Sequence, residues 1–174
     1  PLIAMLDDPE PAVKMAVIDD LRMQHDTRAV GPLLDIALGK DKEFRQAAIR
    51  ALATMNDPRL FDLMLASLQD EDANIRREAA NGLGTLGDKR AIGPLLAALQ
   101  DPDPNVAQTA GRALGHRALL LLALDRMLAL LQAPTVPLMK AVLEGLHNSD
   151  DPHVVETLLP LLRHESADIR TATL

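Results

Sequence analysis

The sequence predicts an all-α protein, an α-solenoid of about six helix pairs. Leu, Ala, Ile, Val and Met supply the apolar residues and only two aromatics occur, Phe44 and Phe61, whereas a β-sheet is expected to use aromatic and β-branched side chains. A pattern of about 31 residues recurs along the chain. Within it, apolar residues return at spacings of three and four on either side of a short polar break, which indicates two packed helices.

The recurrence is clearest at an apolar residue followed, in most repeats, by a basic one. Successive pairs follow one another in the numbering at steps of 31, 31, 31, 32 and 31. The pairs are Val13-Lys14, Phe44-Arg45, Ile75-Arg76, Val106-Ala107, Leu138-Met139 and Ile169-Arg170. Leucines form two further columns, at 21, 52, 83, 114 and 146 on the second helices and at 38, 68, 99 and 162 on the first helices. Because each repeat buries one face of both helices against its neighbours, we expect these leucines to be buried.

We expect one repeat array over residues 1–174. Its six repeats cover roughly residues 1–25, 26–56, 57–87, 88–118, 119–150 and 151–174. The pattern starts and stops inside a repeat, so we expect an array truncated at both ends, in a piece of a longer chain.

Local signals predict where the helices begin and end. Gly87 can close the second helix of the third repeat, and Asp88 can cap the helix that follows. Asp57-Pro58 and Asp151-Pro152 repeat that cap with proline at the first helical position. Pro32 and Pro94, about six residues into their helices, are expected to bend them.

The fifth repeat departs from the pattern. The segment "HRALLLLALDRMLALLQAP", residues 116–134, stays helical in character but lacks the Asp cap and the polar turn. We therefore expect the fourth and fifth repeats to join differently from the others. Its surplus leucines either thicken the core between repeats or leave an apolar patch for a second subunit.

One stretch carries a family resemblance. "DANIRREAANGLGTLGDKRAIGPLLAALQD", residues 72–101, resembles the HEAT-like repeat of the phycobilisome-lyase type. The resemblance implies an outer layer formed by the first helices and a concave inner layer formed by the second helices. It implies a fold far more than a function, because such repeats serve scaffolds, chaperones, lyase subunits and a few enzymes.

Composition argues against several classes of protein. A net charge of −7 disfavours binding to nucleic acid or anionic membrane surfaces. The absence of cysteine excludes disulfides and thiolate metal sites. No apolar run reaches the roughly 18 residues that a membrane span requires. We expect a soluble, cytoplasmic protein.

No catalytic constellation is evident in the sequence. The five histidines lack the spacing of a helical metal site. The His-Glu pairs that hold iron in the related deoxyhypusine hydroxylases are missing from the matching positions, which include Ala16, Ala47 and Ala141. Without Trp or Tyr, the base-stacking groups of repeat-built alkylpurine glycosylases are also missing. We predict a protein that is not an enzyme and carries no metal and no cofactor.

Three basic residues each follow an aspartate at a constant offset of 19 in the numbering. The pairs are Asp26 with Arg45, Asp57 with Arg76, and Asp151 with Arg170. The constant offset predicts a structural ladder of ion pairs between neighbouring repeats, in preference to three ligand contacts. In the irregular repeat both positions change together, to Leu119 and Met139, as a ladder requires.

The inner layer implied by the resemblance offers a continuous surface for a partner. Its candidate binding residues are Met15, Asp19, Gln46, Arg50, Arg77, Asn81, Gln108, Arg112, Lys140 and Glu144. Four of them are basic on an otherwise acidic chain, which favours an acidic segment of another protein. We therefore predict a protein-binding scaffold or adaptor. The alternatives are a bilin lyase-type subunit or chaperone acting on a chromophore-bearing protein, and a solvated helix face without a ligand.

Overall fold

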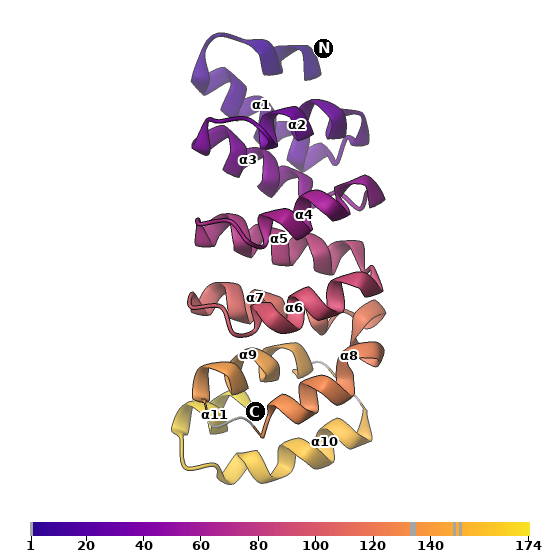
Figure 1. Cartoon of the computed structure of the whole chain (residues 1–174), viewed down its shortest axis with the longest axis vertical. Coiled ribbons are helices and arrows are strands. Elements are labelled where there is room, and N and C mark those ends of the chain that lie inside the picture. Colours follow the sequence, from indigo (N-terminus) through magenta and orange to yellow (C-terminus); the bar gives the residue numbers. More distant parts are fainter. Residues whose placement is uncertain (1, 133–134, 148, 150) are drawn as a thin grey trace. The chain divides into compact units, whose positions relative to one another are not determined.

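The computed structural model describes residues 2–132, 135–147, 149 and 151–174 (Figure 1). Helices joined by short loops make up this part of the chain, which contains no strand. The predicted all-α class is confirmed. The last two residues of the irregular segment, 133 and 134, lie outside the described residues.

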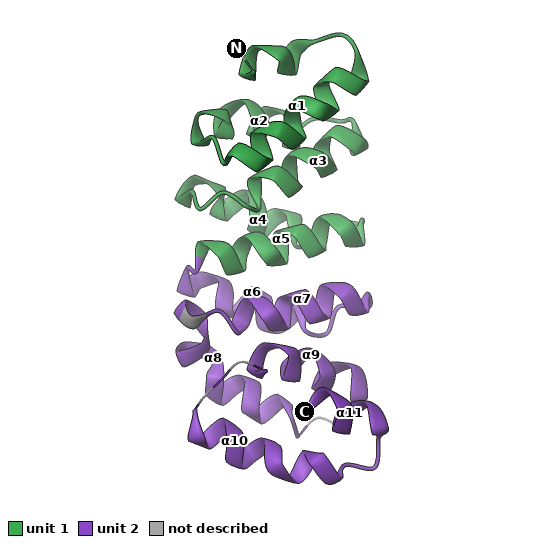
Figure 2. Cartoon of the chain, turned by 180° about the vertical axis from the view of Figure 1, so that it is seen from behind, with its two compact units in different colours: residues 1–86 green, residues 87–174 purple. Residues whose placement is uncertain are grey.

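The helices divide between two compact units, residues 1–86 and residues 87–174 (Figure 2). The first unit contains the 3-10 turns η1 (Ile3–Asp7), η2 (Thr27–Ala29) and η3 (Pro58–Leu60), and the helices α1 (Pro11–Gln24), α2 (Val30–Ala37), α3 (Lys42–Leu52), α4 (Phe61–Ser67) and α5 (Ala73–Leu86). The second unit contains the turns η4 (Lys89–Ala91) and η5 (Leu159–Arg163), and the helices α6 (Ile92–Ala98), α7 (Pro104–Leu114), α8 (Arg117–Leu130), α9 (Val136–Leu146), α10 (Pro152–Leu158) and α11 (Ala167–Ala172).

Each unit has the two-layer arrangement of an α-solenoid. We call the odd-numbered helices, that is α1, α3, α5, α7, α9 and α11, the inner helices, and the others the outer helices. In the first unit α3 packs against both α1 and α5, and in the second α9 packs against both α7 and α11. The outer helices α2, α4, α6 and α8 pack against the inner helices that follow them. The packed helices of each unit thereby bury their apolar stripes against one another.

Aspartate caps begin the outer helices as expected. The carboxylates of Asp57, Asp88 and Asp151 each accept a hydrogen bond from the backbone N–H two residues further on, at 2.9, 2.9 and 2.8 Å. Gly87 follows the end of α5 with a φ of 61°, the left-handed conformation that glycine adopts without strain. These terminal signals are confirmed because they depend only on neighbouring residues.

The outer helices start differently from the expectation at Pro32 and Pro94. Each begins as a 3-10 turn and becomes α-helical only two residues before its proline, at Val30 and at Ile92. The proline is therefore the third residue of the α-helical part, where the backbone N–H has no intrahelical partner to lose. It lies at the start of the α-helix and not in its interior.

Most of the leucine columns form the core. The second-helix column is buried throughout, from Leu21 at 0% exposure to Leu146 at 1%. In the first-helix column Leu68 and Leu99 are buried, but Leu38 is 75% exposed and Leu162 is 38% exposed. The prediction was wrong at Leu38 because Ala37, which is the residue one repeat before Leu68, occupies the buried position.

Helix α8 and the glycines beside it make the fourth and fifth repeats join differently. α8 is one continuous 14-residue helix without a 3-10 start. It buries Leu119 and Met127 and exposes Leu121 and Leu122, so its leucines both fill the core and face outward.

The adjoining inner helices, α7 and α9, meet backbone to backbone. A side chain added at Gly111 on α7 would strike the Ala141 carbonyl of α9, and one added at Gly145 would strike the Gly111 carbonyl. Such closeness lets Cα–H groups contact carbonyl oxygens across the two helices. Only glycine at these positions permits this spacing.

Candidate functional site

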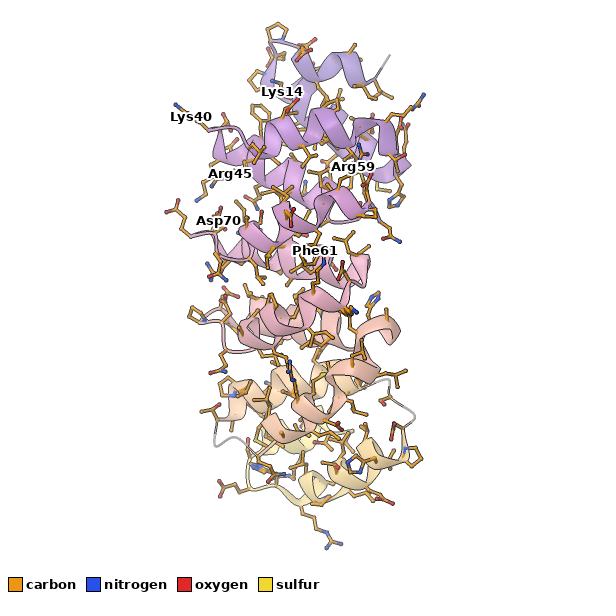
Figure 3. The ribbon with its side chains drawn as sticks, turned by 45° about the vertical axis from the view of Figure 1, so that its right-hand side comes forward. Lys14, Lys40, Arg45, Arg59, Phe61 and Asp70 are labelled. Atoms are coloured by element: carbon orange, nitrogen blue, oxygen red, sulfur yellow. The ribbon has the colours of Figure 1, made fainter. Side chains whose placement is uncertain are left out.

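Two aspartates of the predicted ladder form ion pairs with an arginine two residues further along the chain, in the turn that each aspartate begins. Asp26 pairs with Arg28 at 2.8 Å, and Asp57 pairs with Arg59 at 2.6 Å. Arg45 pairs with Asp70 at 3.5 Å, across α3 and the loop before α5 (Figure 3). The structure thus gives Asp26 and Arg45 other partners than each other.

Helix geometry explains the difference. In each predicted pair the aspartate lies at the start of an outer helix, whereas its expected partner lies beyond the end of that helix. About ten helical residues separate the two by about 15 Å at 1.5 Å per residue. The arginine reaches instead a nearby loop: Arg76 Nη1 donates to the Asp70 and Glu71 carbonyls at 2.9 and 3.1 Å.

The same geometry recurs in the last repeat. Arg170 Nη1 donates to the carbonyls of His164 and Glu165 at 2.7 and 2.9 Å. In both repeats the arginine closes the loop that precedes its own inner helix, and Asp151, like Asp57, caps an outer helix. In these two repeats the basic residue therefore stabilises a loop within its own repeat, whereas Arg45 pairs with Asp70 of the following repeat.

Hydrogen bonding to arginine lowers the pKa of two capping aspartates, Asp57 and Asp88. At Asp57 the largest cause is the hydrogen bond from the Arg59 guanidinium, followed by the Arg59 backbone N–H. Arg90 lowers the pKa of Asp88 in the same way. These carboxylates stay ionised as caps below the ordinary aspartate pKa of 3.8.

All ten predicted partner-binding residues lie on inner helices and none of them is buried. We call these ten residues the inner-helix surface: Met15, Asp19, Gln46, Arg50, Arg77, Asn81, Gln108, Arg112, Lys140 and Glu144. They are available to solvent because the opposite stripe of each inner helix, such as Ile75, Ala79 and Leu83 on α5, forms the core.

Ion pairs link this surface from one inner helix to the next. Arg50 on α3 pairs with Asp19 on α1 at 3.0 Å, and Arg112 on α7 lies 3.7 Å from Glu144 on α9. These contacts bring equivalent positions of neighbouring repeats side by side within each unit. In this column, Asp19 and Arg50 carry opposite charges in successive repeats, and so do Arg112 and Glu144, which could have revealed this pairing in the sequence.

The other two cations of the surface also have carboxylate partners. Arg77 pairs with Glu78 at 2.9 Å and Lys140 lies 3.8 Å from Asp168. The inner-helix surface therefore carries basic groups whose charge is balanced locally. Such half-exposed pairs stabilise by roughly 0.2–1 kcal/mol each, so the cations can exchange partners at small cost.

A cleft in the second unit was not foreseen from the sequence. It has a volume of about 550 Å³ and lies between the loop before α7 and the first turn of α9. Its lining includes Pro102, Ala107, Gln108, Val136, Leu138 and Lys140. The sequence signal was the loss of the repeat's basic residue at Ala107.

Within the described residues, no three His, Asp or Glu side chains converge in a way that could hold a metal ion. No helix in the same part of the chain has the length and apolar content needed to cross a membrane.

Comparison with known proteins gives a family and a fold. A family model for HEAT repeats matches residues 1–73 and 61–146. No curated protein matches the chain in sequence. One similar solved structure is the complex of CpcE and CpcF of phycocyanin lyase from Nostoc sp. PCC7120, at 19% identity and a TM-score of 0.69, with 99% of this chain and 73% of that chain covered.

Designed and engineered proteins are similar as well. A designed armadillo repeat protein in complex with the peptide (KR)4 matches at 15% identity and a TM-score of 0.65, with 99% and 95% of the two chains covered. An engineered protein matches at 19% identity and a TM-score of 0.65, with 99% and 92% covered. At these identities the likeness concerns the fold alone.

Proposed function

The chain belongs to the HEAT-repeat family, and from this we propose that it is a scaffold or adaptor module that binds another protein through the inner-helix surface. One observation supports this most strongly. Equivalent side chains of successive inner helices contact each other, as Asp19 does Arg50, and they remain open to solvent. Repeated exposed positions held in register offer an extended partner a series of similar contacts.

The partner segment that we propose is acidic. Its carboxylates would replace the present carboxylate partners of four cations, Arg50, Arg77, Arg112 and Lys140. The exchange costs little because these side chains are 37–59% exposed and their ion pairs are weak. The affinity gained comes from forming several such contacts at once.

A charge reversal tests this proposal. We expect the variant Arg77→Glu/Arg112→Glu to bind a fluorescein-labelled acidic peptide of Glu and Leu at least about tenfold more weakly than the unmodified chain does, measured by anisotropy, since the loss of each ion pair with the peptide costs on the order of 1 kcal/mol. The matched control is Lys40→Glu/Arg126→Glu, which changes the net charge equally at exposed positions outside the inner helices. Circular dichroism establishes that all variants stay helical.

Salt dependence provides a second measurement. Exposed charges are screened over about 8–10 Å near physiological ionic strength, so added salt should weaken binding to the inner-helix surface. Equal affinity for an acidic peptide and its lysine counterpart, or full binding by the double reversal, would contradict the proposal.

A second candidate is a bilin lyase-type subunit or chaperone. It is favoured by the likeness to the phycocyanin lyase complex and by the cleft in the second unit. Titration with a bilin distinguishes the two candidates. A saturable change in its visible absorption would support the lyase-type function, whereas an adaptor leaves the spectrum unchanged.

A further inference from the structure

The outer helix α10 and the turn η5 that continues it expose an apolar position that earlier repeats bury. α10 lies at the lower edge of the second unit (Figure 2), and its Val155 is 48% exposed. Residues at the same place in three earlier repeats are exposed by 8% or less: Val30, Phe61 and Ile92. The side chain at this position is therefore still apolar where nothing in the described chain covers it.

Two leucines continue the same exposed face. Leu162 is 38% exposed, whereas Leu99, at its place in an earlier repeat, is 1% exposed. Leu159 is 57% exposed, whereas Leu128, one repeat earlier, is 7% exposed. Spacings of four in the α-helix and three in the 3-10 turn align these side chains along one side. We call Val155, Leu159 and Leu162 the α10 stripe.

Charged residues at the two ends of the α10 stripe indicate what covers it. Glu156 follows Val155, and Arg163 follows Leu162, so the two charges lie on the same flank of the stripe at opposite ends. Both side chains are exposed, and neither has an ion-pair partner among the residues that the structure describes. A partner that fits this face therefore needs an apolar stripe with the two charges in reverse order.

A second copy of this chain meets that requirement. In a contact with two-fold symmetry, each residue faces the one at the same distance on the other side of the axis. With the axis running across the two helices beside Leu159, they pack antiparallel and Val155 of one copy faces Leu162 of the other. Glu156 of each copy then faces Arg163 of the other, because both charges lie on the same flank.

We propose that the α10 stripe is the contact surface of a symmetric, antiparallel homodimer of this chain. The contact removes three aliphatic side chains per copy from water and forms two equivalent ion pairs. The stretch from Val155 to Arg163 is only about 15 Å long, at 1.5–2.0 Å per residue. Such a small interface gives weak, reversible association. The site lies on an outer helix, so it goes beyond the inner-helix surface and does not depend on it.

Sedimentation equilibrium of the whole chain tests the proposal. We expect the average mass to rise from monomer toward dimer between about 1 μM and about 1 mM, the range of weak affinities. Leu159→Glu should abolish the dimer, because it places two carboxylates together at the axis. The matched control is Leu121→Glu on α8, which changes a leucine of 76% exposure and should leave the dimer intact. Circular dichroism establishes that both variants stay helical.

A charge exchange tests the antiparallel arrangement itself. Glu156→Arg and Arg163→Glu should each weaken dimerisation about tenfold or more, since either change creates two like-charge pairs in the symmetric contact. The double variant Glu156→Arg/Arg163→Glu should dimerise as the original chain does. An equimolar mixture of the two single variants should form a mixed dimer, because each copy then offers the charges that the other lacks.

Three results would overturn the proposal. A chain that stays monomeric up to about 1 mM would leave the α10 stripe to another occupant, such as a further helical repeat. A dimer unaffected by Leu159→Glu would use a different surface. Single charge reversals that weaken the dimer without recovery in the double variant would exclude the antiparallel two-fold contact.

Discussion

Replacing Gly111 by alanine should destabilise the second unit, although alanine is the better helix former. A Cβ at Gly111 would strike the carbonyl group of Ala141 on α9, whose carbon would lie 2.9 Å away. The obstacle is backbone of a helix whose Ala141 and Val142 are buried at 0% exposure. It cannot turn aside as a flexible side chain could, so α7 and α9 must separate.

The magnitude follows from two opposing effects. Overpacking typically costs about 1–3 kcal/mol, and a contact with backbone belongs near the upper end. Exchanging glycine for alanine inside a helix contributes about 0.8–1.0 kcal/mol in the opposite direction. The net loss in the free energy of unfolding should be about 2 kcal/mol. For a chain of this size that corresponds to a fall in Tm of about 4–8 °C.

Thermal and urea unfolding followed by circular dichroism measure this loss. Gly93→Ala on α6 is the matched control, because a Cβ there meets nothing within 4 Å. It should raise stability by up to about 1 kcal/mol. If Gly111→Ala were as stable as Gly93→Ala, the close approach of α7 and α9 would not exist in solution.

Further predictions concern the core and the caps. Leu83→Ala, at 0% exposure, should cost about 2–5 kcal/mol in urea unfolding, whereas Leu121→Ala, at 76% exposure, should change stability little; equal effects would show that Leu83 is not in the core. Asp57→Ala should cost about 1 kcal/mol through loss of the cap, and Asp57→Asn should cost less because its amide oxygen still accepts the N–H. Because Arg59 lowers the pKa of Asp57 in the folded chain, its stabilisation is full above the unfolded pKa near 3.8 and is lost as the pH falls below it. A difference in stability between the original chain and Asp57→Ala that stayed constant down to about pH 2 would contradict this.

The interactions between repeats show where sequence reasoning ended. The aspartate caps were predicted correctly, yet Asp26 and Arg45 were assigned to each other although each has another partner. A constant spacing establishes that two positions recur together, but not that they lie at the same end of a helix. Likewise Leu38 was placed in the core by its identity, whereas the register puts Ala37 there.

The sequence by itself determined the all-α class, the period, the buried leucines of the inner helices and the ends of many helices. These features follow from hydrogen bonding between residues that are near in the sequence and from burial that recurs with the period. The local sequence therefore suffices to predict them. The tertiary structure decided which charges meet, how closely α7 approaches α9 at Gly111 and Gly145, and that the alanine at 107 borders a cleft. Those outcomes depend on the distance and register between packed helices. Side chains that lie far apart in the sequence jointly determine both.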